Sequence, residues 1–261
     1  MVAMVTLSSI SRDPARNPRG AFSIIELLVS VTIMSFLAVM ALPALQGIKG
    51  AAAVTDSAYQ IGATLQHART YAMTHNTYVW VGFYEQKSGT DAATVSQPPY
   101  AGKGQVVLGI AASVDGTQIY DDTASPASLP ASRIKPVGKL VRMENVHLTD
   151  VGGPSGAAAA ESSLDARSSL PYNGAAGAAA RISSDSSEAT TFPMTLDGYT
   201  FYKTIRFAPS GEAAINGGAS PQRMGEIGLR PTHGGTVDQQ TPNVAAVQFT
   251  GIGGNVQIYR R

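Results

Sequence analysis

The sequence predicts an α+β fold in which a long N-terminal helix, transmembrane in its first part, packs on an antiparallel β-sheet in the C-terminal domain. Three observations lead to this class. The run from Leu27 to Ile48 has no charged residue and is long enough to cross a bilayer, which takes roughly 20 apolar residues. An apolar stripe at helical spacing follows it. From Thr77 onward, runs of β-branched and aromatic residues alternate with glycine and proline, as is typical of strands and turns.

A lone carboxylate, Glu26, stands at the entrance to the apolar run. Arg12, Arg16 and Arg19 precede it, and the positive-inside rule then leaves this basic segment in the cytoplasm and exports the remainder of the chain. A carboxylate carried toward the bilayer centre costs about 2.5–3.5 kcal/mol. Because a charge in that position is costly, Glu26 is a candidate functional residue.

The residues around Glu26 resemble the leader and first helix of type IV prepilins and of type II secretion pseudopilins. In that family a basic leader ends at a small residue, and the mature chain begins with Phe, a small polar residue, two aliphatic residues and Glu. The same order occurs here as Phe22, Ser23, Ile24, Ile25 and Glu26. The resemblance therefore places the start of the mature chain at this motif.

The resemblance implies a processing site formed by Gly20, Ala21 and Phe22, cut after Ala21 by a prepilin peptidase that also acts as N-methyltransferase. With this cut Glu26 is the fifth residue of the mature chain, and Pro43 falls where many pilins carry a proline. The family's usual residue before the cut is glycine, so a cut after Gly20, which makes Glu26 the sixth residue, stays open. Pro43 also removes a backbone donor, which predicts a helix kink there.

Two other interpretations fit a basic segment followed by an apolar run. An ordinary secretory signal has an apolar region of roughly 7–15 residues, which is shorter than the run found here. A plain signal anchor would insert in the same orientation. Neither explains Glu26 in register with Pro43, so the prepilin-type interpretation is preferred.

These features divide the sequence into a leader peptide (1–21), a long helix (22–75) that spans the membrane over about 24–45, and an exported β-rich domain (76–261). We expect a single-pass protein of the cytoplasmic (inner) membrane whose C-terminal domain faces the periplasm or the cell surface. Residues 152–190 consist mainly of Gly, Ala and Ser. Because such a segment buries too little apolar surface to offset its ordering entropy, a flexible insertion is predicted there.

The helix is expected to continue beyond the membrane run, because small and apolar residues recur at gaps of four and three. They are Gly47, Ala51, Val54, Ala58, Ile61, Leu65, Ala68 and Ala72. Polar residues occupy the opposite face, which predicts one packed and one hydrated side. A histidine suits the negative end of a helix and asparagine tolerates the left-handed conformation, so the helix is expected to end near His75 and Asn76.

Seven strands are predicted in the C-terminal domain from their β-branched and aromatic residues. They cover residues 77–84, 105–110, 140–148, 199–208, 226–230, 244–250 and 255–259. The last two are separated by a glycine-rich segment, which predicts a closing hairpin.

Short pieces of this domain extend the resemblance. Residues 204–211 and 247–261 are similar to the strand–turn–strand pieces that close the H-type minor pseudopilins. Residues 66–76 and 135–139 are similar to the D-type protein of the Verru/Chthon cassette, a pilin-like family. These pieces assign no functional residue.

Composition narrows the function classes. The chain has 261 residues, a net charge of +1 and no cysteine, so no basic surface indicates a nucleic-acid partner, and disulfides and thiolate metal sites are excluded. The histidines, His67, His75, His147 and His233, lack metal-binding spacing and are expected at the surface or at helix ends. No cofactor, metal site or catalytic motif is predicted, and we expect no enzyme.

The resemblance implies a minor-pilin-like or pseudopilin-like structural subunit, assembled through its N-terminal helix into a type IV pilus or a type II secretion-like filament. The implied partners are the prepilin peptidase/N-methyltransferase, other pilin or pseudopilin subunits, the inner-membrane assembly platform and membrane lipid. Glu26 would pair with the new ammonium on Phe22 of a neighbouring subunit, since either charge alone is unfavourable in hydrocarbon. The alternative is a membrane-anchored, exported binding module that does not assemble.

Overall fold

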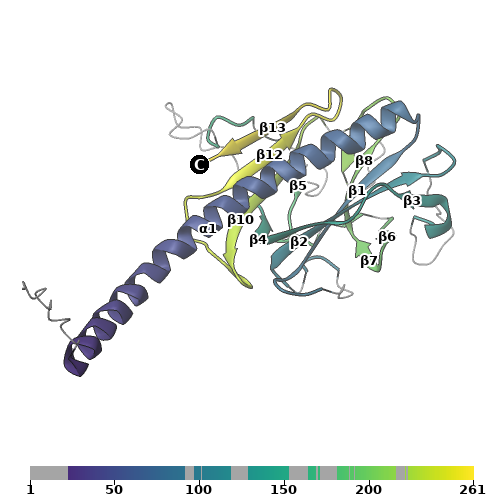
Figure 1. Cartoon of the computed structure of the whole chain (residues 1–261). Coiled ribbons are helices and arrows are strands. Elements are labelled where there is room, and N and C mark those ends of the chain that lie inside the picture. Colours follow the sequence, from purple (N-terminus) through teal and green to yellow (C-terminus); the bar gives the residue numbers. More distant parts are fainter. Residues whose placement is uncertain are drawn as a thin grey trace, which may run out of the picture. The chain divides into compact units, whose positions relative to one another are not determined.

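The structure is a computed structural model that describes residues 23–91, 97–100, 102–118, 129–152, 164–168, 170, 181–187, 189–190, 192–215, 221 and 223–261, and only the backbone of 41–51 (Figure 1). The chain divides into two compact units, Met1–Ala44 and Leu45–Arg261. The first unit contains the beginning of the long helix. The second contains the remainder of that helix and all of the strands.

The described residues form one α-helix, one short 3₁₀-helix and thirteen strands. The helices are α1 (Ile24–Thr74) and η1 (Ala131–Arg133). The strands are β1 (Val79–Lys87), β2 (Gly104–Ser113), β3 (Ile134–Pro136), β4 (Val141–Thr149), β5 (Arg181–Ile182), β6 (Met194–Leu196), β7 (Tyr199–Phe201), β8 (Lys203–Phe207), β9 (Ala213–Ile215), β10 (Gly225–His233), β11 (Thr236–Val237), β12 (Ala245–Phe249) and β13 (Val256–Arg260). The fold is thus α+β, with an N-terminal helix and a large antiparallel sheet, as the sequence predicts.

Helix α1 ends where the sequence predicts a stop. Asn76 adopts a left-handed conformation, with φ 48°. The amide of Thr77 then donates to the carbonyl of Ala72 at 3.0 Å, and a ring nitrogen of His75 lies 3.2 Å from the carbonyl of Tyr71. These contacts occupy carbonyls that the last helical turn leaves without a partner.

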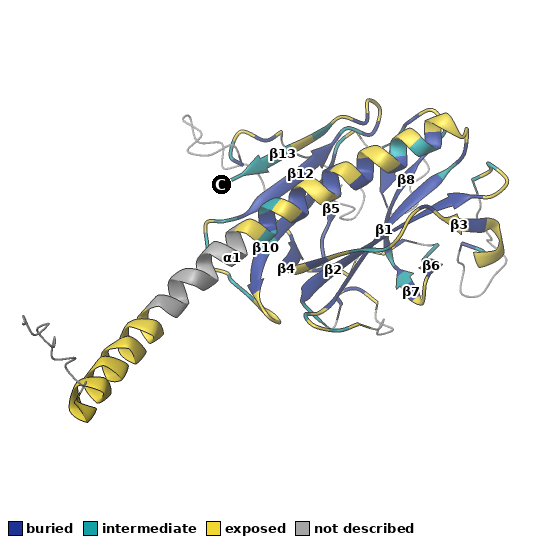
Figure 2. Cartoon of the chain, viewed as in Figure 1, coloured by how far each residue is buried: buried dark blue, intermediate teal, exposed yellow. Residues whose placement is uncertain are grey.

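The predicted apolar stripe on the second half of α1 is buried in the main core of the second unit. Its described members, Val54, Ala58, Ile61, Leu65, Ala68 and Ala72, have no exposed surface. They pack with side chains from one face of the sheet, among them Val81, Leu108 and Val247. Figure 2 shows this half of α1 with one buried and one exposed side. The helical spacing therefore identified the packed face correctly.

The main sheet has the strand order β13-β12-β10-β4-β2-β1-β8-β9; in addition β5 and β11 pair with β10, and β3 pairs with β2. All of its pairings are antiparallel except that of β5 with β10. Six of the seven predicted strands are continuous, and β12 and β13 form the predicted hairpin. The range 199–208 is divided at Tyr202 into β7 and β8, which belong to different sheets. The strands that were not predicted are two or three residues long, too short to show a period.

The opposite face of the sheet carries a second, aromatic core under the β6–β7 hairpin. Its buried side chains include Trp80 and Tyr84 from β1 and Phe201 from β7. Gly82 and Gly109 are cross-strand partners in β1 and β2, and a Cβ on either would lie within 3.0 Å of Phe201. The two glycines thus make room for this ring on the sheet, and Trp80 packs in the same core.

Strand β4 contains a bulge that reverses which side chains face the main core. The register between β2 and β4 shifts after Gly104, and the extra residue, Asn145, has φ 60°. Met143 before the bulge and Val146 after it both belong to the main core, although they are three residues apart. The bulge consequently places His147 on the other side of the sheet from Val146.

Truncation of the α1 stripe should destabilise the second unit. Leu65→Ala removes a fully buried side chain, so we expect the free energy of unfolding to fall by about 2–5 kcal/mol. Tyr59→Ala, on the exposed side of α1, should change it by less than about 0.5 kcal/mol. Chemical denaturation of the full-length protein in detergent measures both. Equal effects of the two variants would contradict the assigned packing face.

Candidate functional site

Glu26 lies in the first turn of α1. The amides of Glu26 and Leu27 donate to the carbonyl of Ser23, at 3.0 and 3.1 Å, and so begin the helix at this point. The side chain of Glu26 is exposed in the single chain. A carboxylate in the first turn is favoured by the positive end of the helix dipole, so this position suits a charge that awaits a cationic partner.

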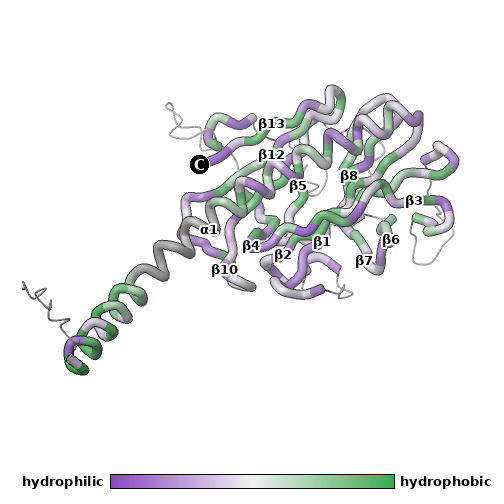
Figure 3. Tube along the Cα trace, viewed as in Figure 1, coloured by the Kyte–Doolittle hydropathy of each residue, from purple (hydrophilic) through white to green (hydrophobic). Residues whose placement is uncertain are grey.

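The helix surface around Glu26 is apolar on all sides. Residues 23–40 are all exposed, and most are large and apolar, as the hydropathy colours show (Figure 3). Three hydroxyl groups are paired within the helix: Ser30 donates to the carbonyl of Glu26 at 2.7 Å, and Thr32 and Ser35 donate to carbonyls four residues before them. Glu26 is therefore the one ionisable group on this described stretch, and the rest of its surface requires an apolar environment.

The structure does not describe the side chains of the other predicted site residues. Gly20, Ala21 and Phe22 are outside the described residues, as is the side chain of Pro43, whose backbone belongs to α1. Among the described residues, no helix has the length and apolar character needed to span a membrane. The cleavage site, the kink and the membrane span stay predictions.

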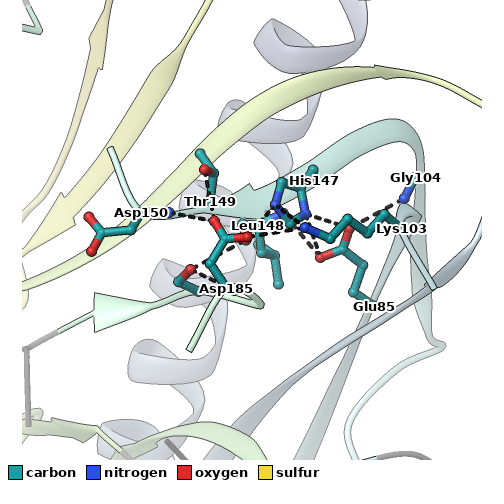
Figure 4. A network of polar contacts seen from close by, with 9 residues as sticks. Glu85, Lys103, Gly104, His147, Leu148, Thr149, Asp150 and Asp185 are labelled. Carbon is teal, nitrogen blue, oxygen red and sulfur yellow. Dashed lines mark hydrogen bonds and ion pairs between the residues drawn. The ribbon is translucent and has the colours of Figure 1, made fainter. Parts of the chain in front are cut away.

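A second polar cluster lies inside the β-domain and is centred on His147, which has no exposed surface (Figure 4). Its Nδ1 lies 2.8 and 3.0 Å from the two carboxylate oxygens of Glu85, and its Nε2 lies 3.0 Å from Oδ1 of Asp185. The ammonium of Lys103 donates to the same Oδ1 at 3.2 Å. The expectation that His147 lies at the surface is wrong, because the bulge in β4 turns it between these two acids.

Backbone amides complete the pairing of both carboxylates. Glu85 accepts from the amides of Gly104 and Leu148, at 3.2 and 3.3 Å. Val146 of β4 pairs with Gly104, the first residue of β2, and β4 continues beyond this point. The amide of Leu148 therefore has no β2 residue opposite it, and it donates to the carboxylate of Glu85 instead. Asp185 accepts from the Thr149 hydroxyl and the Asp150 amide, at 3.0 and 3.2 Å.

These contacts favour an imidazolium between two carboxylates. Burial opposes protonation of His147, but the hydrogen bonds and charges of Asp185 and Glu85 outweigh it and raise the pKa of His147 above its ordinary value of 6.5. The hydrogen bond from His147, together with those from Lys103 and Asp150, holds the pKa of Asp185 well below its usual range against the opposing effect of burial. The cluster therefore places the buried side chains of His147 and Glu85 beside the partly exposed Asp185 and Lys103, with charges that compensate one another.

The geometry of this cluster suits the attachment of residues 183–185 to β4. The hydroxyl of Thr149 donates to Asp185 instead of facing His147, and both ring nitrogens are occupied by carboxylates. In the part of the chain that the structure describes, no group of three or more His, Asp and Glu side chains could hold a metal ion. What the cluster does is tie residues 183–185 to β4, where the amide of Ser184 also donates to the carbonyl of Leu148 at 2.9 Å.

A second buried ion pair joins the 152–190 segment to the sheet at another point. Arg167 donates to Glu226 of β10 at 2.9 Å, and both side chains are almost fully buried. Gln248 of β12 also donates to Glu226, at 2.8 Å. Arg167 also donates to the carbonyls of Leu164, Val151 and Gly152. A buried arginine with this number of acceptors holds its loop firmly.

The described parts of the predicted flexible insertion are therefore packed. Within 152–190, residues 164–168 and 181–187 contact the sheet, Leu164 is buried, and β5 pairs with β10. The expectation of a flexible loop counted apolar side chains and left out charged residues, such as Arg167 and Asp185, that pair with buried groups. The only sequence signal was their presence in a Gly/Ala/Ser-rich segment. The flexibility of the insertion as a whole stays a prediction.

Comparison with known proteins identifies the N-terminal segment. Residues 16–42 match the prokaryotic N-terminal methylation motif. The match covers the proposed processing site and Glu26 and ends just before Pro43. It supports a prepilin-type leader and implies processing by a prepilin peptidase. No curated protein and no solved structure matches the chain.

Stability should depend on pH through His147. Because folding raises the pKa of His147, its ion pairs stabilise the fold fully below pH 6.5, and this contribution is lost as the pH rises through the folded-state pKa. For Asp185 the sign is opposite: its contribution is present above its ordinary pKa of 3.8 and is lost as the pH falls below that value. Thermal unfolding followed by near-ultraviolet circular dichroism of Trp80 measures both limbs.

His147→Gln should lower the free energy of unfolding by about 3 kcal/mol and abolish the loss of stability above pH 6.5, because it leaves a buried carboxylate without a charged partner. His67→Gln is the control, since His67 is exposed on α1. A pH profile that His147→Gln leaves unchanged would contradict the assigned charge state.

Proposed function

We propose that this chain is a minor-pilin-like or pseudopilin-like structural subunit that assembles through its N-terminal helix into a type IV pilus or a type II secretion-like filament. The observation that carries the proposal is the methylation motif at 16–42, which contains the single carboxylate of the apolar helix. A prepilin peptidase/N-methyltransferase would cut after Ala21 and methylate Phe22.

The exposed surface at the start of α1 is suited first to lipid and then to contact with other subunits. Residues 23–40 expose large apolar side chains on all sides, and the hydroxyls of Ser30, Thr32 and Ser35 are paired within the helix. Such a surface suits lipid before assembly and the helices of other subunits afterwards. The sequence run from Leu27 to Ile48, free of charge, supports insertion in the cytoplasmic membrane with the β-domain exported.

Glu26 gives assembly its register. After cleavage, the ammonium of Phe22 in one subunit would pair with Glu26 of its neighbour. Because both charges lie in an apolar environment, each alone is unfavourable, and the pair forms only when the two helices stand at the correct height. The partners are other pilin or pseudopilin subunits and the inner-membrane assembly platform.

The proposed role is structural and not enzymatic. Within the described residues no hydroxyl is directed at the imidazole of His147, and the carboxylates of its cluster are occupied by amides and cations. The cluster supports a rigid exported domain, which is what a filament subunit presents to its surroundings.

Replacement of Glu26 tests the proposal. Glu26→Val should leave the protein in the membrane fraction but reduce its recovery in sheared filaments by about tenfold or more, because the neighbour's ammonium loses its partner. Asp56→Asn, which removes an exposed carboxylate from the second half of α1, should assemble normally. Quantitative immunoblots of the membrane and filament fractions measure both.

Normal incorporation of Glu26→Val would contradict the pairing. Absence of the unaltered protein from every filament and secretion complex, despite membrane location, would favour the exported binding module instead.

A further inference from the structure

Strand β13 ends the main sheet (Figure 1). The amide of Leu164 donates to the carbonyl of Arg260 at 3.1 Å on the outer edge of β13, so among the described residues only the first half of that edge is open. The backbone amide of Thr250 donates to the carbonyl of Asn255, and the amide of Arg261 donates to the carbonyl of Val244. Because alternate residues of an antiparallel strand face the same neighbour, every second residue from Asn255 to Arg261 directs its backbone groups toward β12. The backbone groups of Val256 and Ile258 consequently point away from the sheet. They have no hydrogen-bond partner among the described residues.

A hollow of about 450 Å³ adjoins this edge. It is lined by one turn of α1 and by the start of β13: Gln66, Arg69, Thr70, Gly254, Asn255, Val256 and Gln257. All of these residues belong to the second unit. The lining is polar, and Arg69 is its only charged member.

Two hairpin turns hold the Arg69 guanidinium in place. Its Nε donates to the carbonyl of Gly211 at 3.2 Å, in the β8–β9 turn. In the β12–β13 turn a Cβ on Gly254 would lie 2.1 Å from the same Nε, and Gly254 has φ 63°, so only glycine allows this approach. An arginine has five donor hydrogens, and this one bonds no carboxylate among the described residues. The remaining donors are available beside the open edge.

We propose that β13 and this hollow form a docking site for an extended peptide segment of a partner protein that carries an acidic side chain. The segment adds a strand to β13 through the backbone groups of Val256 and Ile258, and its Asp or Glu carboxylate pairs with Arg69. Backbone hydrogen bonds supply affinity in such strand addition, and a side-chain pocket supplies specificity. The single cation in the hollow selects the charge of that side chain. This site lies outside the methylation motif and the exposed apolar stretch 23–40 of α1, and it does not depend on filament assembly.

Selection of peptides from a random library tests the site directly. Peptides of about eight residues, the length of an ordinary strand, are displayed and selected on the full-length protein in detergent. We expect enrichment of one Asp or Glu at a fixed position among β-branched residues. A selected peptide should bind about tenfold or more weakly when that acid becomes its amide, or when the protein carries Arg69→Gln.

Further variants separate the two elements of the site. Arg69→Lys keeps the charge and should retain part of the affinity, and Arg223→Gln, at an exposed arginine elsewhere, should retain all of it. Binding should slow hydrogen exchange at the amides of Val256 and Ile258 by about tenfold or more. N-methylation of alternate peptide amides should abolish binding.

Three results would overturn the proposal: no enrichment of an acidic residue, equal binding by Arg69→Gln, or binding that leaves exchange at Val256 and Ile258 unchanged. Saturation of the hollow by free acetate or glutarate, with no effect of peptide N-methylation, would show an anion site without strand addition. Normal filament assembly of Arg69→Gln would leave the proposed function intact.

Discussion

The packing of one apolar stripe on α1 against the main sheet is the contact on which the β-domain depends. Among the described residues α1 is the only α-helix, and Val54, Ile61 and Leu65 fill the main core with side chains from one face of the sheet. The other face is covered by the β6–β7 hairpin and its aromatic core. Strands β1 and β2 are therefore covered on both faces, which explains why they are buried almost throughout.

The same helix carries two different surface patterns, and these indicate different surroundings. Residues 23–40 are exposed and mostly apolar on every side, whereas residues 54–72 are apolar on one side only. A one-sided stripe needs only its own sheet. An all-round apolar surface needs lipid or other helices, and the methylation motif at 16–42 occupies that part. Sequence motif and surface chemistry thus support the same role for the N-terminal segment.

The sequence predicted what periodicity and turn chemistry encode: the α1 stripe, the stop at Asn76, the closing hairpin and most long strands. It did not predict His147 or the packed parts of 152–190. Both depend on contacts between residues far apart in the chain, such as Arg167 with Glu226. A buried charge is acceptable only because a distant partner exists, and spacing along the chain contains no information about that partner. Glu26 was visible because the apolar run around it makes a charge conspicuous.

Intact-mass and N-terminal peptide analysis of the membrane-extracted protein, produced with and without a prepilin peptidase, tests the central claim most directly. We expect a peptidase-dependent mature chain that begins at N-methylated Phe22. A chain that begins at Ala21 would keep the class of protein but change the register of Glu26. An uncut chain, or one cut beyond Ala41 by another enzyme, would contradict the account.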